Sequence, residues 1–385
     1  MHPLTLAICS ALALLAVGGG LYPELRRKPE PPAGGFPSLP PLAELNAAAA
    51  LSTPEERRRS WREERRQLRR RWEAALGPLP RRGPVSVETL STETLPDHLR
   101  LLLRYPDESG RPIEAYLLLP RDGAGSRRRR RRPGVVVLHQ TSNTTLRDPV
   151  GLDSREPMHM ALHLVRRGYV CLAPRNVLWS RPELSLQQVT DELLNPSPSK
   201  PGEPAPYRWK TGMAKMLWDA RRATDVLAAR PEVNPRRLGC IGHSLGGKEV
   251  LYLAAFDPRI RATISCEGGI GIPFSNWEAD WYLGKQAHSP TFGLDHHSLL
   301  ALVAPRAFML IGGSSADGPQ SWPYLEAALP AWRILDAEDR LGLFLHTHGH
   351  DFPPPGPERE RVYGWLDHWL APPTSKTGGS PAATE

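Results

Sequence analysis

The chain has 385 residues, 40% of them hydrophobic, and a formal net charge of +8 at pH 7. This length and apolar content are enough for one large folded core or two smaller ones. Six positive charges lie in one run, Arg127 to Arg132, which we expect to be a solvated loop, with binding to an anionic surface as the alternative. The other Lys and Arg residues form no basic stripe interleaved with aromatic residues, so nucleic-acid binding is not expected.

The first residues carry an export signal or an anchor. Residues 4–17 form an apolar run, followed by three glycines, of the length found in the hydrophobic core of signal peptides. No Lys or Arg precedes the run, and Arg26-Arg27-Lys28 follows it, a pattern that suits an uncleaved anchor. We therefore expect an exported protein, with a membrane tether through residues 4–17 as the alternative.

A Pro- and Ala-rich stretch, typical of a linker, follows this leader. Thr53 then provides an N-cap, with Pro54 in the first turn and Glu56 closing a capping box, which predicts a charged helix. We divide the chain into a leader, a linker, a charged helix with its connection, a main catalytic domain and a disordered tail, at residues 1–20, 21–50, 51–84, 85–371 and 372–385.

The main domain begins with an antiparallel hairpin, because the turn-rich sequence PDESGRP joins two apolar stretches, residues 99–104 and 113–119. Beyond it, short apolar runs alternate with helical segments. Such runs indicate a mostly parallel sheet with helices on both faces, whose strands end on one edge. The expected strands are 134–139, 169–173, 237–242, 260–266, 307–311 and 343–346, and the expected helices are 157–167, 212–230, 245–256, 322–335 and one ending at residue 370.

The segment GCIGHSLGGK, residues 239–248, matches two different motifs. From Gly242 to Lys248 it is close to the phosphate-binding loop G-x-x-x-x-G-K, but Glu249 stands where that loop needs a hydroxyl for magnesium. Around Ser244 it is a G-x-S-x-G nucleophile elbow between an expected strand and an expected helix. This context favours the elbow, with the Ser244 hydroxyl exposed above the sheet.

A serine nucleophile needs a general base and an orienting acid, and in this topology the acid and then a His follow it along the chain. Asp317 comes just after the expected strand 307–311, and His350 lies in the loop before the last helix. We therefore predict Ser244 as the nucleophile, His350 as the general base and Asp317 as the acid that orients the imidazole.

Several segments, among them HQTSNTT, VRRGYVCLAPR, GCIGHSLGGKEVLYLAAFDPRI and HGHDFP, together resemble the α/β-hydrolase superfamily. The resemblance covers roughly residues 85 to 371 and is to the dienelactone-hydrolase, acetyl-xylan-esterase and glucuronoyl-esterase branches. It implies the α/β-hydrolase fold with the same nucleophile and base. The oxyanion hole that it implies is made by the backbone N–H groups of Leu245 and of Gln140 or Thr141.

The resemblance leaves the acid open. The segment TISCEGG resembles glucuronoyl esterases, and in many of them the glutamate after that strand is the acid. In this chain that residue is Glu267, directly after the expected strand 260–266. We prefer Asp317, because the end of the next strand is the commoner position, and keep Glu267 as the alternative.

Further residues near these motifs are candidates for the substrate pocket: His139, His243, Glu267, Trp277 and Trp281. Trp277 and Trp281 lie in an aromatic-rich segment, which would either wall a pocket for sugar or aryl groups or pack a lid. For His139, at the end of the first buried strand, a structural hydrogen bond is favoured over proton transfer.

A metal site is the weaker interpretation of the sequence H-x-H-x-H-D at residues 346–351. Its last two residues are in the reverse order to the motif of metallo-β-lactamase-type hydrolases, and no further ligand motif accompanies it. The pair His296-His297 is expected to lie in a loop. We therefore expect neither a metal nor an organic cofactor.

The sequence thus predicts an exported serine hydrolase that cleaves carboxylic esters through an acyl-enzyme. The expected partner is a small-molecule or carbohydrate ester, and the resemblance suggests acyl or uronoyl esters of carbohydrates. Two alternatives stay open: a peptidase-like amide hydrolase with the same machinery, and a non-catalytic binding protein of the same fold. The sequence carries no signal for an oligomeric state.

Overall fold

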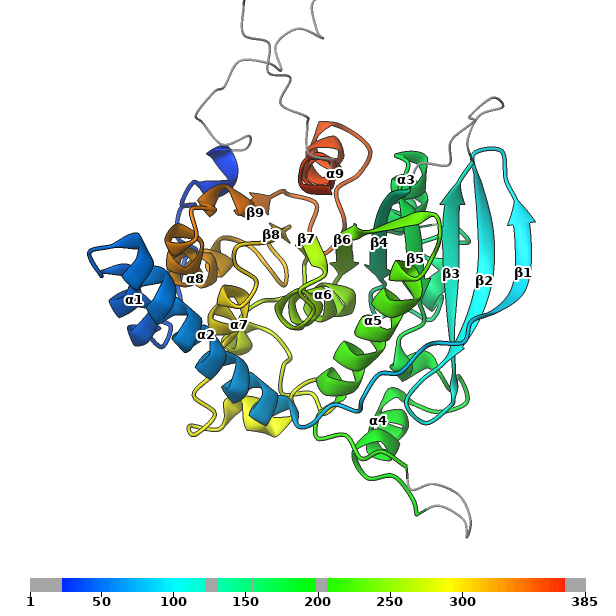
Figure 1. Cartoon of the computed structure of the whole chain (residues 1–385), viewed down its shortest axis with the longest axis horizontal. Helices are drawn as coiled ribbons and strands as arrows, with labels where there is room; N and C mark the ends of the chain where they lie inside the picture. The colour runs from blue at the N-terminus through cyan, green and yellow to red at the C-terminus, as the bar shows by residue number, and fades with distance from the viewer. Residues whose placement is uncertain (1–22, 122–130, 154, 199–205, 371–385) are drawn as a thin grey trace, which may run out of the picture.

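The computed structural model describes residues 23–121, 131–153, 155–198 and 206–370. The predicted leader, most of the arginine run and the predicted tail lie outside these ranges. Within them, nine strands form one sheet in the order β1-β2-β3-β5-β4-β6-β7-β8-β9 (Figure 1). The strands are β1 (Glu88–Thr94), β2 (His98–Pro106), β3 (Pro112–Pro120), β4 (Arg132–Leu138), β5 (Val170–Pro174), β6 (Val233–His243), β7 (Ile260–Cys266), β8 (Ala307–Gly312) and β9 (Leu341–Leu345).

The sheet is antiparallel at one side and parallel over the rest. β1, β2, β3 and β5 pair antiparallel, with the predicted hairpin formed by β2 and β3. From β5 through β4, β6, β7 and β8 to β9, each pair is parallel. The residues that follow these parallel strands therefore meet at one edge of the sheet. The predicted sheet is confirmed, and β1 is added to it.

Helices cover both faces of the sheet, as predicted. α3 and α9 pack on one face, in a buried cluster that includes Leu164, Met309 and Trp365. α5, α6 and α8 cover the other face, where Val136 and Leu310 are buried (Figure 1). The helices are α1 (Ala43–Ala49), α2 (Pro54–Leu76), α3 (Met160–Arg166), α4 (Leu186–Leu194), α5 (Gly212–Ala228), α6 (Leu245–Phe256), α7 (His296–Ala301), α8 (Trp322–Ile334) and α9 (Pro357–Leu370).

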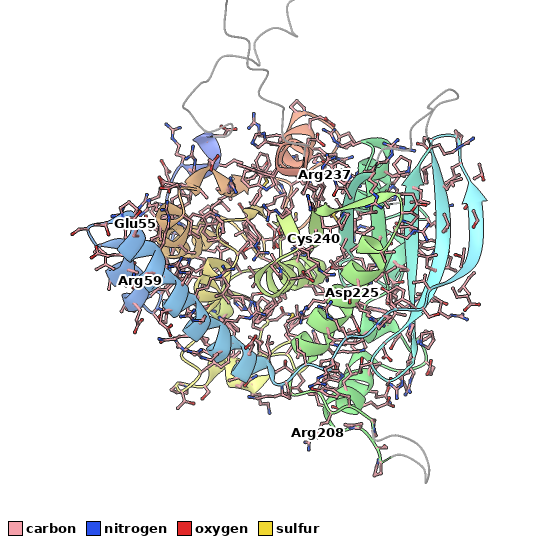
Figure 2. The ribbon with its side chains drawn as sticks, viewed as in Figure 1. Glu55, Arg59, Arg208, Asp225, Arg237 and Cys240 are labelled. Atoms are coloured by element: carbon pink, nitrogen blue, oxygen red, sulfur yellow. The ribbon has the colours of Figure 1, made fainter. Side chains whose placement is uncertain are left out.

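The predicted charged helix is α2, which lies against α7 and α8. The Thr53 side chain accepts a hydrogen bond from the Glu56 N–H, and the Glu56 carboxylate accepts one from the Thr53 N–H, so the capping box is present. Glu55 and Arg59 lie on its exposed side (Figure 2). Its inward side chains are buried: Trp61, Leu68 and Trp72.

Residues 23–50, expected to be a linker, pack on the main domain instead. Leu25 lies against β9 and is 2% exposed, and α1 buries Leu45 between α2 and α8. The composition indicated a linker because prolines and alanines dominate it, but a few apolar side chains are enough to fix such a segment once a surface is available.

Besides α1, two more short helices were not expected. α4 lies between β5 and α5, and α7 carries His296 and His297, which were expected in a loop and are buried. Helices of six to nine residues show too few turns for a clear apolar period. Across the described ranges, every helix is too short or too polar to cross a lipid bilayer.

Candidate active site

Ser244 stands at a sharp turn between β6 and α6. Its backbone has φ 54° and ψ −115°, a strained conformation for a residue with a side chain. A Cβ at Gly242 would lie 2.2 Å from the carbonyl oxygen of Gly246, and a Cβ at Gly246 would lie 2.1 Å from that of Leu138. Only glycine fits at these two places. The turn is a nucleophile elbow that holds Ser244 at the N-terminal end of α6.

His350 reaches Ser244 from the loop after β9. Its Nε2 lies 2.9 Å from Ser244 Oγ, and its Nδ1 lies 3.2 Å from Glu267 Oε2. With a proton on Nδ1, the ring donates to Glu267 and leaves Nε2 to accept from the Ser244 hydroxyl. The His350 side chain is 43% exposed, whereas that of Glu267 is fully buried. The three groups have the geometry of a nucleophile, a base and an orienting acid.

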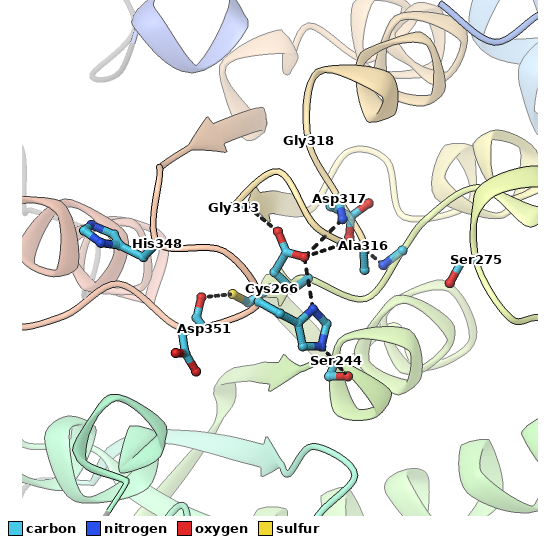
Figure 3. Close-up of polar contacts among 12 residues, drawn as sticks. Ser244, Cys266, Ser275, Gly313, Ala316, Asp317, Gly318, His348 and Asp351 are labelled. Atoms are coloured by element: carbon cyan, nitrogen blue, oxygen red, sulfur yellow. Dashed lines mark hydrogen bonds and ion pairs between the residues drawn. The ribbon is translucent and has the colours of Figure 1, made fainter. Parts of the chain in front are cut away.

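Backbone N–H groups of the loop after β8 fix the Glu267 carboxylate. Oε1 accepts a hydrogen bond from Gly313, and Oε2 accepts from Ala316 at 2.6 Å and from Asp317 at 3.3 Å (Figure 3). These donors offset the cost of burying a charge. These donors therefore hold the Glu267 carboxylate with Oε2 toward His350.

The Asp317 carboxylate has other partners. It accepts hydrogen bonds from the N–H groups of Gly269 at 2.7 Å and Ile270 at 2.9 Å, and from the Ser321 hydroxyl at 2.8 Å. Burial raises the pKa of Asp317, and these hydrogen bonds oppose that effect. Asp317 thus ties the loop after β7 to the loop after β8.

The expected contact between Asp317 and His350 is therefore corrected: the carboxylate that His350 contacts belongs to Glu267, the alternative. The reason is the path of the loop at residues 313–317. This loop presents its backbone N–H groups to Glu267, so the Asp317 side chain binds the backbone of the neighbouring loop instead.

The residues predicted to form the oxyanion hole lie on two segments in contact. Leu245 is the first residue of α6, and Gln140 and Thr141 follow β4, against whose end the start of α6 packs. The Gln140 side chain donates to Asp148 at 2.5 Å, which holds the chain beyond β4. Both segments border the turn at Ser244, so the predicted donors remain our assignment.

The two candidate pocket histidines have different surroundings. The buried ring of His243 lies with its centre 5.0 Å from that of His350, and burial, with the neighbouring imidazole, lowers the pKa of His243 to about 3. His139 accepts from the Asn176 N–H at 3.1 Å and meets the Trp179 ring edgewise, and burial lowers its pKa to about 4. His243 therefore lies against the triad, whereas His139 joins two loops.

Sequence reasoning missed the placement of Lys248, one helical turn after Ser244. Its Nζ is buried, donates to Ser275 Oγ at 2.6 Å and lies 4.0 Å from the centre of the Trp277 ring. Burial lowers the pKa of Lys248 to about 7. The signal was a lone lysine in an otherwise largely apolar helix, LGGKEVLYLAAF, which we considered only as part of a phosphate loop.

Of the two candidate tryptophans, one borders these groups. Trp277 is buried and donates from Nε1 to the Gly269 carbonyl at 2.8 Å, on the loop that Asp317 also holds. Trp281 is half-buried and its ring meets that of Tyr282 at 6.1 Å. Trp277 thus packs Lys248 of α6 against the segment that follows β7.

The three alternating histidines take separate partners. His346 accepts from the His348 N–H at 3.1 Å, His348 contacts Glu358 at 2.7 Å, and His350 faces Ser244. Among the residues that the structure describes, no group of three or more His, Cys, Asp or Glu side chains is placed to hold a metal ion.

Comparison with known proteins adds a family resemblance in sequence. Residues 209–287, about a fifth of the chain, match the family described as glucuronyl esterase, fungi. A 4-O-methyl-glucuronoyl methylesterase of Hypocrea jecorina (strain QM6a) is 29% identical over 169 residues, which are 36% of this chain and 36% of that protein. The aligned part spans about a third of the length of such relatives. The family match includes both Ser244 and Glu267.

Solved structures extend the likeness over most of the described chain. A glucuronoyl esterase from Solibacter usitatus has a TM-score of 0.62 at 19% identity, covering 82% of this chain and 94% of that one. Another, from Teredinibacter turnerae T7901, has a TM-score of 0.60 at 18% identity and covers 86% and 89%. The chain has the α/β-hydrolase fold. The predicted fold is thereby confirmed.

Proposed function

We propose that this α/β-hydrolase is a serine esterase that cleaves carboxylic esters through an acyl-enzyme. The observation that carries the proposal is the line of contacts from Ser244 Oγ through the His350 imidazole to the Glu267 carboxylate. A hydroxyl is a weak nucleophile at neutral pH, and a neutral imidazole at 2.9 Å is the base that it needs. A buried acid behind the imidazole stabilises the imidazolium that forms.

In the proposed mechanism, Ser244 Oγ attacks the ester carbonyl carbon while His350 Nε2 takes the hydroxyl proton. The C–O bond to the alcohol breaks, and His350 returns the proton to the leaving oxygen. Water, activated by the same imidazole, then hydrolyses the acyl-enzyme to the free acid and regenerates Ser244. The donors assigned to the oxyanion are the backbone N–H groups of Leu245 and of Gln140 or Thr141.

We further propose uronoyl esters of carbohydrates as the substrates, with other acyl esters of carbohydrates as the broader class. The relative from Hypocrea jecorina supports this, because it is a 4-O-methyl-glucuronoyl methylesterase.

Export is part of this proposal, and the apolar run near the N-terminus supports it. The apolar run at residues 4–17, outside the described ranges, would act as the signal or as an anchor. Mass spectrometry of the N-terminus of the protein made in its native host distinguishes a cleaved leader from a retained one.

The decisive experiment compares wild type with Ser244→Ala. We expect a fluorophosphonate probe to label the wild type and not the variant, and hydrolysis of the methyl ester of glucuronic acid to fall at least about 10³-fold in kcat. Ser52→Ala, which changes an exposed serine outside the site, is the matched control and should behave as wild type. A folded wild type that the probe does not label would instead indicate a non-catalytic binding protein.

A further inference from the structure

A cavity of about 500 Å³ lies apart from the catalytic contacts, between the tip of the β2–β3 hairpin, α4, the start of α5 and residues 175–182 after β5. This volume is in the range of small-molecule sites. Ser244, His350 and Glu267 are not among the residues that line it. The proposed mechanism therefore leaves this cavity without a role.

A buried ionic cluster forms one wall of the cavity. Lys215 is 1% exposed, and its Nζ contacts Glu108 at 2.6 Å, Asp219 at 2.9 Å and Asp107 at 3.1 Å. Burial raises the pKa of Asp219 to about 7, so the excess negative charge of this cluster is partly neutralised by a proton.

Two ion pairs lie on the other walls of the cavity. Arg175 contacts Glu114 at 3.0 Å, and Arg181 contacts Glu192 at 2.5 Å. A charged ligand that bound Arg175 or Arg181 would compete with these carboxylates and leave one of them desolvated. A neutral ligand with many hydroxyl groups can instead hydrogen-bond to the free lone pairs and N–H groups of the paired side chains.

Aromatic side chains line the same space. The rings of Tyr207 and Trp209 meet edgewise with their centres 4.8 Å apart. Trp179, in the segment that follows β5, also lines the cavity. The polar ends of the Tyr207 and Trp209 side chains already have partners: Trp209 Nε1 donates to Glu108 of the ionic cluster, and the Tyr207 hydroxyl donates to the Pro78 carbonyl. Apolar ring surface next to paired charges suits a sugar ring, which has C–H faces and an equatorial rim of hydroxyls.

The position of the cavity relates it to the catalytic serine. Its wall begins just after β5, Ser244 follows β6, and only β4 lies between these strands, so the two strand ends are about 10 Å apart. Two contacts connect the wall with the segment after β4: Trp179 meets His139 with ring centres 5.5 Å apart, and Arg175 donates to Thr145 at 3.2 Å. The cavity and the serine thus share one edge of the sheet.

We propose that this cavity is a second carbohydrate subsite, which binds a neutral sugar unit of the chain whose ester reacts at Ser244. The inference rests on the proposed function for its substrate class, but binding at the cavity needs no catalysis. Unesterified neutral oligosaccharide should therefore bind to the wild type and to Ser244→Ala equally well.

The test is calorimetric titration of full-length protein with xylotetraose, a neutral oligosaccharide without an ester. Trp179→Ala removes one aromatic wall and should weaken binding about tenfold or more. Tyr207→Ala tests the opposite wall and serves if the first variant does not fold, as judged by its thermal unfolding. Trp369→Ala, a half-buried tryptophan on α9, is the matched control and should bind as wild type.

Two results would overturn the subsite. One is the absence of xylotetraose binding to a folded wild type that still reacts with the fluorophosphonate probe, and the other is binding that Trp179→Ala and Tyr207→Ala leave unchanged. Preference for an anionic oligogalacturonate over xylotetraose would also contradict the neutral character argued from the ion pairs. Loss of probe labelling with intact xylotetraose binding would refute the esterase and keep the subsite.

Discussion

Glu267 and Asp317 are both buried carboxylates, but only Glu267 contacts His350. Glu267 faces the imidazole itself, while the Asp317 carboxylate binds backbone N–H groups of the loop after β7. The backbone N–H of Asp317 also donates to Glu267. Asp317 is thus a positioning residue for the loop that fixes the acid.

Glu267→Gln keeps the shape of the side chain and removes its charge. We expect kcat for ester hydrolysis to fall about 10³- to 10⁴-fold, because the imidazolium at His350 loses its counter-charge and the favoured tautomer is lost. Steady-state kinetics with the methyl ester of glucuronic acid measures this change.

Asp317→Asn is the matched variant. It should cost less than about tenfold in kcat but lower the free energy of unfolding by about 1–3 kcal/mol, because an amide cannot accept all three hydrogen bonds. Denaturant unfolding measures that loss. A larger fall in kcat for Asp317→Asn than for Glu267→Gln would reverse the assignment.

At the residue scale, the sequence was sufficient where the signal is local. Ser244 lies in a five-residue motif and His350 in a loop before a helix. The residues next to them in the sequence were therefore enough to predict their roles. The acid was different, because two carboxylates each followed a parallel strand. Only the path of the 313–317 loop decided which of them His350 meets.

At the scale of elements, the elbow depends on close packing between the end of β4 and the start of α6. A hydrogen atom at Gly246 is all that fits against the carbonyl oxygens of Leu138 and His139. This contact sets the spacing between the segments that carry the proposed oxyanion donors. The absence of a side chain at Gly246 therefore sets the distance between the end of β4 and the start of α6.

Gly246→Ala should test that spacing. A methyl group 2.1 Å from the Leu138 carbonyl oxygen must push α6 and β4 apart. We expect kcat/KM to fall about 10²-fold and the free energy of unfolding to fall by about 1–3 kcal/mol. Gly83→Ala is the control, because nothing lies within 4 Å of a Cβ there, and it should change stability by less than about 0.5 kcal/mol.

Elements with a strong pattern were predictable, and those without one were not. The parallel strands have continuous apolar runs, and α2 has a capping box before a helical apolar stripe. β1 has the largely polar sequence ETLSTET, which shows no apolar pattern, and it joins the sheet by pairing with β2. α4 and α7 are short, so packing rather than periodicity made them helical.

At the scale of the whole molecule, a buried acid makes stability depend on pH. Glu249 is 4% exposed and accepts from the Asn176 side chain at 2.8 Å. Burial raises its pKa from 4.5 to about 8. The folded protein therefore binds a proton there between pH 4.5 and 8 that the unfolded chain has released, so this group loses its contribution to stability as the pH rises through that window.

Glu249→Gln removes the titration and keeps the neutral hydrogen bond. We expect the free energy of unfolding of wild type, relative to the variant, to decline as the pH rises from about 4.5 to 8 and to stay level above it. Denaturant unfolding at several pH values measures the difference. A constant difference across this range would show that Glu249 is ionised in the folded protein.

The sequence by itself determined the fold class, the parallel sheet with its hairpin, the elbow at Ser244 and the position of His350 along the chain. These depend on apolar periodicity and on short motifs, which are local properties of a chain. Tertiary structure alone decided that Glu267 faces His350, that Lys248 is buried beside Trp277, and that residues 23–50 pack on the core. Each of these depends on which segments meet in space. The free energy of such a contact depends on both segments together, so the sequence of either segment alone does not predict it.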